Sequence, residues 1–108
     1  MARLIQLQTF YGDSGALSVF ENIFEGKIKD ICFLLHKNKL NTTLNLFQKM
    51  NANRGLVALN GSCTIQAKEA FFLHKPEDCL LLLPDDSFDI ISYSEDCLLI
   101  LIIKAHEN

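Results

Sequence analysis

The chain has little of what marks the common functional classes, and each shortage excludes something. None of its four cysteines forms a C-x-x-C pair, which excludes a zinc knuckle and a redox dithiol. Its ten lysines and arginines are scattered along the chain and the formal net charge is −3, so no basic stripe is present for a nucleic acid. No G-x-S-x-G motif is present to hold a nucleophilic serine.

Long hydrophobic runs are also missing. The longest apolar run covers residues 97–103, which is too short to cross a membrane but suits a buried strand. Arg3, Gln6 and Gln8 interrupt the first apolar stretch, so we expect no signal peptide. We therefore expect a cytoplasmic protein with neither a membrane nor a nucleic acid as its partner.

The cysteines are Cys32, Cys63, Cys79 and Cys97, and each lies in or beside an apolar segment. This placement predicts four small buried side chains kept reduced in the cytoplasm. With 108 residues, of which 49% are hydrophobic and 21% charged, the composition is that of a globular protein. We expect a single domain over residues 1–108, which buries about two thirds of the unfolded surface.

Short apolar segments separated by turn residues dominate the sequence, a pattern typical of an antiparallel all-β domain. The predicted strands cover residues 3–9, 16–21, 28–35, 42–49, 54–59, 62–67, 70–73, 79–83, 88–92 and 97–103. Asn60 and Gly61 tolerate positive φ, so they predict a two-residue type I′ hairpin. Because so many short strands leave exposed edges, we expect them to close into a barrel or jelly roll.

Several segments resemble one enzyme family. Residues 56–63 (LVALNGSC) resemble the "GS" hairpin of cupins, and are most similar to that of the sugar-nucleotide 3,4-ketoisomerases acting on dTDP-4-keto-6-deoxyglucose. Residues 15–21 (GALSVFE), 81–84 (LLLP) and 93–99 (YSEDCLL) are similar to other stretches of that family, in the same order. The resemblance implies a cupin-type double-stranded β-helix. It also implies a homodimer whose subunits pair or exchange N-terminal strands.

The family's working motif, R-G-x-H-A-H, is absent. Counted back from Gly61, its two histidines fall at Phe47 and Lys49. Histidine suits the acid and base roles of a ketoisomerase, and phenylalanine can perform neither. The chain's histidines are His36, His74 and His106, far apart and without a carboxylate at ligand spacing. We therefore expect no metal and no cofactor.

Alternation over the predicted strand 42–49 places Asn45, Phe47 and Lys49 on one face. Because the family's histidines point into the barrel, the resemblance makes this face the lining of a ligand pocket. Lys49 then either extends its ammonium to the barrel mouth, contacts a ligand anion, or serves as a catalytic base. Phe88 and Tyr93 match aromatic positions of the family and are either core residues or a platform for a sugar.

Two charged features have simpler interpretations. Arg54 precedes an apolar strand, where we expect a salt bridge at the rim or at an interface rather than a clamp for an anion. Asp85, Asp86 and Asp89 follow Pro84, where aspartates typically accept hydrogen bonds from nearby backbone N–H groups.

Two functional hypotheses follow. In the first, the chain is a degenerate ketoisomerase-like cupin without catalysis in nucleotide-sugar or surface-polysaccharide metabolism. It then either holds a nucleotide sugar or serves as a protein-interaction module. In the second, it is a divergent dTDP-sugar ketoisomerase or epimerase that uses Lys49 as its acid and base.

Overall fold

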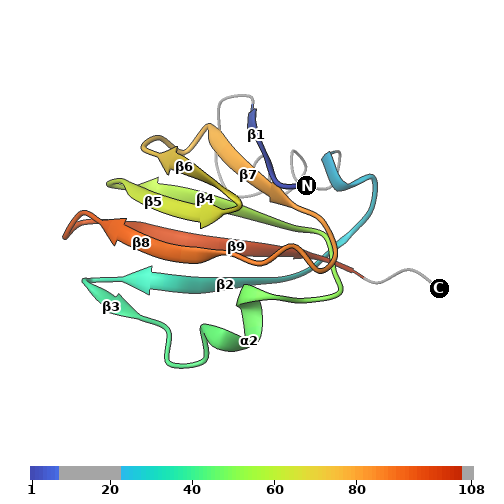
Figure 1. Ribbon diagram of the computed structural model, residues 1–108, viewed down its shortest axis with the longest axis horizontal. Helices are drawn as coiled ribbons and strands as arrows, with labels where there is room; N and C mark the ends of the chain where they lie inside the picture. Colours follow the sequence, from blue (N-terminus) through green and yellow to red (C-terminus); the bar gives the residue numbers. More distant parts are fainter. Residues whose placement is uncertain (8–22, 106–108) are drawn as a thin grey trace.

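A computed structural model describes residues 1–7 and 23–105 of the chain, and the strand expected over residues 16–21 lies outside them. The described part consists of antiparallel strands, the short helix α2 and the helical residues Ile23 and Phe24 (Figure 1). The elements are β1 (Arg3–Gln6), β2 (Ile28–His36), β3 (Lys39–Leu40), α2 (Asn45–Gln48), β4 (Arg54–Asn60), β5 (Cys63–Ala67), β6 (Glu69–Leu73), β7 (Asp78–Leu82), β8 (Asp89–Tyr93) and β9 (Leu98–Lys104). The prediction of an all-β domain is confirmed.

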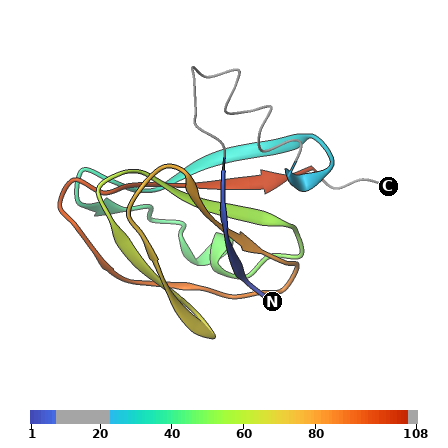
Figure 2. The same ribbon diagram turned by 90° about the horizontal axis from the view of Figure 1, so that it is seen from above.

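The strands form two sheets that lie face to face, as the view from above shows (Figure 2). The larger sheet has the order β1-β7-β4-β9-β2-β3, and the smaller one has the order β6-β5-β8. In β5 the buried residues alternate with half-buried ones, as expected of a strand with one face toward the core. In contrast, β9 is buried at five consecutive positions, because it lies in the middle of the larger sheet.

Two apolar clusters cover the two faces of the larger sheet. The inner cluster lies between the sheets and includes Leu56, Leu99 and Leu101, together with Cys63 and Ile65 of the smaller sheet. The outer cluster comprises Leu7, Phe24, Val57, Cys79, Ile100 and Ile102. At about 25 cal/mol per Å² of apolar surface, this two-sided burial is the main source of stability.

The strand predicted over residues 42–49 is wrong. Its place is taken by the single turn of α2, and only Lys49 forms an isolated bridge, with Ser87. The Asn41 side chain accepts a hydrogen bond from the Thr43 N–H at 2.8 Å, which starts a turn. Leu44 and Phe47 then both pack on the inner cluster, at the i, i+3 spacing of a helix.

The type I′ hairpin at Asn60-Gly61 is also wrong, because β4 and β5 belong to different sheets. Gly61 has φ of 66°, but Asn60 does not adopt positive φ, and a type I′ turn needs both. The pair is instead a corner that carries the chain from one sheet to the other. The Asn60 side chain ties this corner to the carbonyl of Asp96 at 3.0 Å.

No helix within residues 1–7 and 23–105 is long and apolar enough to cross a membrane.

Candidate functional site

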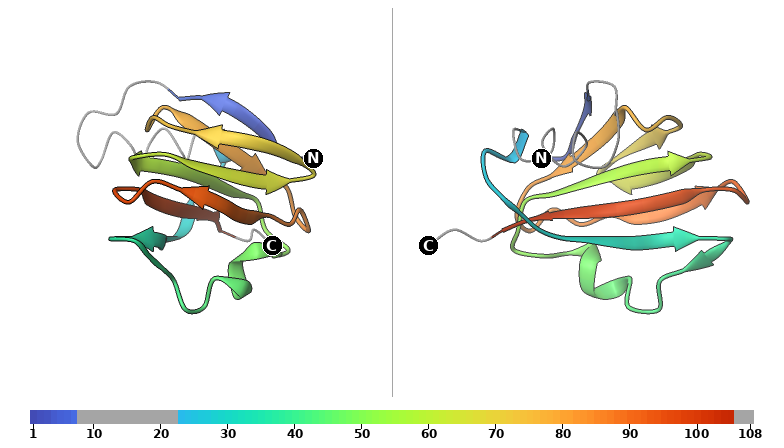
Figure 3. Two further views of the ribbon diagram at one scale, coloured as in Figure 1. Left: turned by 60° about the vertical axis from the view of Figure 1, so that its left-hand side comes forward. Right: turned by 180° about the vertical axis from the view of Figure 1, so that it is seen from behind.

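The space between the sheets is where the sequence resemblance locates a pocket, and apolar side chains occupy it. Both sheets contribute, and the segment around α2 adds Leu44, Phe47, Met50 and Ala52 from the side. Figure 3 shows this segment beside the two sheets, on the side of β3. The helix thus presents a phenylalanine to the core at the position where the resemblance expects a histidine.

Among the described residues, Arg54 is the one charged residue in the set of large side chains that are fully buried. Its Nη1 donates to the carbonyl of Phe47 at 3.0 Å, and its Nη2 donates to the carbonyls of Leu83 at 3.0 Å and Asp86 at 2.6 Å. Its Nε donates to the carbonyl of Ala52 at 3.1 Å. The guanidinium therefore joins the α2 segment to the loop after β7.

The prediction of a rim or interface salt bridge at Arg54 is wrong, because its hydrogen bonds in the described residues go to main-chain carbonyls. Desolvation by burial lowers the pKa of Arg54, and the charges of Asp86 and then Asp85 oppose that shift. A lone arginine in an apolar strand was the sequence signal for this role. With its donors directed at carbonyls, Arg54 is not available to hold a ligand.

The expected pocket residues do not converge on one cavity. Asn45 and Lys49 are exposed, and Phe47 is half-buried against the core. Phe88 is 2% exposed and belongs to the inner cluster, which favours the core interpretation. Tyr93 is 38% exposed at the other end of β8. None of the five lines the cavities of about 470, 260 and 170 Å³ whose walls are described residues.

The acidic loop after β7 follows its prediction in part. The Asp86 carboxylate accepts a hydrogen bond from the Leu83 N–H at 2.8 Å and lies 3.6 Å from the terminal amine of Met1. The Asp89 carboxylate accepts from the Gln48 side chain at 2.8 Å, which holds α2 against β8. These carboxylates stabilise a loop and a helix, and Asp86 also lines a cavity of about 170 Å³ together with Asp85 and Lys68.

A second polar cluster was not predicted from the sequence. Asp78, nearly fully buried at the start of β7, lies 3.6 Å from Nδ1 of His74 and accepts a hydrogen bond from the Gln6 side chain at 3.2 Å. His74 also stacks on Phe72 with ring centroids 5.1 Å apart. The cluster joins β1 to β7 and lines none of the three described cavities.

All four cysteines are free, as predicted, and three of them are buried. Burial raises the pKa of the Cys63 and Cys79 thiols to about 12, and it also raises the pKa of Cys97. The pKa of half-buried Cys32 is raised by its partial burial and by Asp30. At neutral pH these thiols are protonated, so they offer neither a nucleophile nor a base. No group of three metal-ligating side chains comes together within the described ranges.

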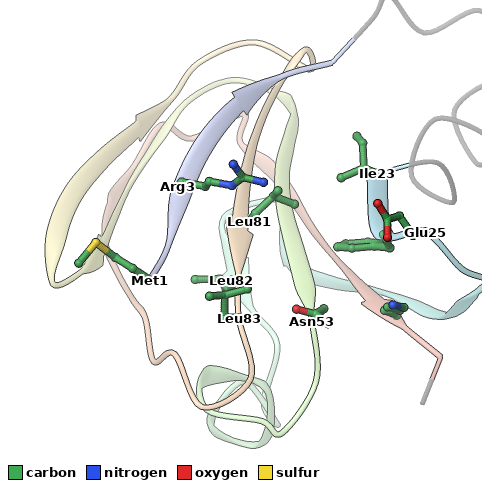
Figure 4. Close-up of a pocket in the computed structure, with 10 residues that line it drawn as sticks. Met1, Arg3, Ile23, Glu25, Asn53, Leu81, Leu82 and Leu83 are labelled. Atoms are coloured by element: carbon green, nitrogen blue, oxygen red, sulfur yellow. The ribbon is translucent and has the colours of Figure 1, made fainter. Parts of the chain in front are cut away.

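The largest of the three described cavities lies outside the barrel interior, with a volume of about 470 Å³ (Figure 4). Arg3 of β1 and Leu81 of β7 form one side, and the turn from Ile23 to Glu25 forms the other. Asn53 and Lys104 line the end where β4 begins and β9 ends, and Met1, Leu82 and Leu83 complete the lining. The alternation of side chains over the predicted strand 42–49 indicates only an interior pocket, so the sequence did not predict this outer groove.

No family model and no curated protein matches the chain. Among solved structures, it is similar to the X-ray structure of WlaRA, a TDP-fucose-3,4-ketoisomerase from Campylobacter jejuni. The match has a TM-score of 0.64 and 16% sequence identity, and covers 99% of this chain and 84% of the other. At that identity the likeness establishes the fold, and the predicted cupin-type double-stranded β-helix is confirmed.

Proposed function

We propose that this chain is a cupin-fold protein, related in fold to sugar-nucleotide ketoisomerases, that acts without catalysis as a binding or partner module. The observation that carries the proposal is the apolar interior of the barrel. A 3,4-ketoisomerase must remove a proton next to a carbonyl and return one to the neighbouring carbon. It needs a base and an acid in contact with the sugar, and donors for the developing enolate oxygen.

The groups inside the barrel cannot perform these steps. The Cys63 thiol in the inner cluster has a pKa of about 12, so it is protonated at neutral pH. Arg54 directs its donors at carbonyls. Phe47 and Phe88 pack in or against the core with rings that carry no exchangeable proton. Of the two non-catalytic roles, this packing favours a module that works through its outer surface over one that holds a nucleotide sugar inside.

The proposed setting is nucleotide-sugar or surface-polysaccharide metabolism, and the similarity in fold to a TDP-fucose-3,4-ketoisomerase supports it. We also propose that the chain is a single domain and forms a homodimer. Ile31 and Phe33 support the dimer, because they are 44% and 58% exposed on the outer face of β2, where they extend the outer apolar cluster.

The alternative, an isomerase that uses Lys49, receives less support. A lysine becomes a base when burial favours its neutral amine, and Lys49 is exposed. It also follows α2 at an isolated bridge with Ser87, outside the inner cluster. Deuterium exchange from solvent into a 4-keto sugar nucleotide distinguishes the two proposals.

Thermal unfolding in the presence of ligands tests the non-catalytic proposal. We expect no shift of the midpoint with millimolar dTDP-hexoses, UDP-hexoses or GDP-hexoses. A ligand at a hundred times its Kd adds about 2.7 kcal/mol, which raises the midpoint of a domain this size by about 4–8 °C. A shift of that size that persists when the outer groove is altered by Arg3→Gln would show an open interior site and overturn the packed-barrel account.

A further inference from the structure

We propose that the outer groove beside β1 and β7 is a binding site for a small amphipathic anion, an apolar body that carries one carboxylate-like group. This site goes beyond the proposed function, which names no small-molecule ligand for the outer surface. The groove has a volume of about 470 Å³. Sites for small molecules typically measure about 300–1,000 Å³ and combine apolar walls with a few polar groups.

The apolar wall of the groove is preformed. Phe24 is 7% exposed and lies on β4 at Gly55, where an added Cβ would be 3.4 Å from its ring and 3.0 Å from the Cys79 sulfur. A larger residue at this position would push the ring away from the sheet. Leu81 lies on the same side of Gly55, because the same added Cβ would be 4.0 Å from the Cδ2 atom of Leu81. The wall can therefore receive an apolar body without rearrangement.

The charged groups give the groove its selectivity. Arg3 pairs with Leu81 in the register between β1 and β7, so both side chains stand on the same face of the sheet. Figure 4 shows Arg3 extending over Leu81 toward the opposite side, where Glu25 lies. Half-buried Lys104 also lines the groove, so the lining carries two cationic side chains and one acidic side chain in a chain of net charge −3.

This balance favours a ligand with a single negative charge. A guanidinium such as that of Arg3 binds a carboxylate through two parallel hydrogen bonds. The side-chain amide of Asn53, which also lines the groove, can donate a further hydrogen bond. Glu25 repels an anion, so it should weaken the binding of a ligand that carries two or more negative charges.

Titration calorimetry with decanoate tests the site, with 1-decanol and inorganic phosphate as probes that each lack one half of the proposed ligand. We expect saturable one-to-one binding of decanoate only. Arg3→Gln and Lys104→Gln should each weaken it about tenfold, since a charge-assisted hydrogen bond contributes about 1.5 kcal/mol. Glu25→Gln should strengthen it. Lys39→Gln, at the exposed opposite edge of the sheet, should leave it unchanged.

Absence of saturable decanoate binding, or equal affinity in Arg3→Gln, Lys104→Gln and Lys39→Gln, would overturn the proposal. Amide NMR spectra of each variant confirm that it is folded, so a loss of affinity is assigned to the groove. The outcome is separate from that of the proposed function. Catalytic turnover would refute the non-catalytic role without touching the groove, and failure of decanoate to bind would leave the packed interior as described.

Discussion

At the scale of single residues, Arg54 joins the α2 segment to the loop after β7. We expect Arg54→Met to lower the free energy of unfolding by about 3 kcal/mol or more, because four main-chain carbonyls lose a donor at once. Urea denaturation measures the change. Arg3→Met is the matched control, since Arg3 is exposed and a surface substitution typically changes stability by less than about 0.5 kcal/mol. Equal losses in the two variants would contradict this role for Arg54.

The buried thiol of Cys79 makes stability depend on alkaline pH. Its pKa is about 12 in the folded chain, against an ordinary value of 9.0. Above about pH 9 the unfolded thiol ionises while the folded one stays protonated, so stability is complete below pH 9 and falls toward pH 12. Between pH 8 and pH 10.5 we expect the wild type to lose roughly 2 kcal/mol more than Cys79→Ala. Identical pH slopes in urea denaturation would contradict this.

At the scale of elements, the corner between the two sheets depends on Gly61. Its φ of +66° disfavours other residues, and an added Cβ would lie 2.5 Å from the Ser94 hydroxyl and 2.8 Å from Cα of Cys97. We expect Gly61→Ala to lower the free energy of unfolding by about 2–3 kcal/mol, through backbone strain and overpacking together. A loss below about 0.5 kcal/mol would show that the corner relaxes freely.

Most strands were predictable because their apolar residues are bounded by turn residues. Residues 28–35, 62–67 and 97–103 of the sequence all appear as strands, shifted by a residue or two at the ends. Residues 42–49 were not predictable in this way, since the spacing of their apolar residues fits both a helix and a strand. The helix is favoured because it packs both Leu44 and Phe47 against the core. Such contacts with distant residues cannot be inferred from the local sequence pattern.

The same limit applies to the candidate site. The absence of the histidine pair at Phe47 and Lys49 could be predicted by counting from the "GS" segment. The hydrogen bonds of Arg54 could not be predicted, because their acceptors are main-chain carbonyls of segments up to 32 residues away. The outer groove combines Arg3, Leu81 and Lys104, which come from three strands, and only the sheet order brings them together.

At the scale of the whole molecule, the expected homodimer gives a direct prediction. Light scattering should report a mass of roughly 24 kDa, twice the 12.2 kDa of the chain. Phe33→Glu should shift this mass toward the monomer, because it places a charge on the exposed apolar part of the outer face. Leu46→Glu is the control, since Leu46 is 62% exposed on α2. A monomeric wild type would contradict the dimer.

The central claim is that a cupin barrel with this packed interior performs no isomerisation. Incubation with dTDP-4-keto-6-deoxyglucose in D₂O, followed by mass spectrometry, tests it most directly. A base acting next to the carbonyl would exchange that hydrogen for solvent deuterium. The account predicts no deuterium incorporation above buffer alone. Incorporation that is abolished by Lys49→Met would contradict the account and establish the alternative isomerase.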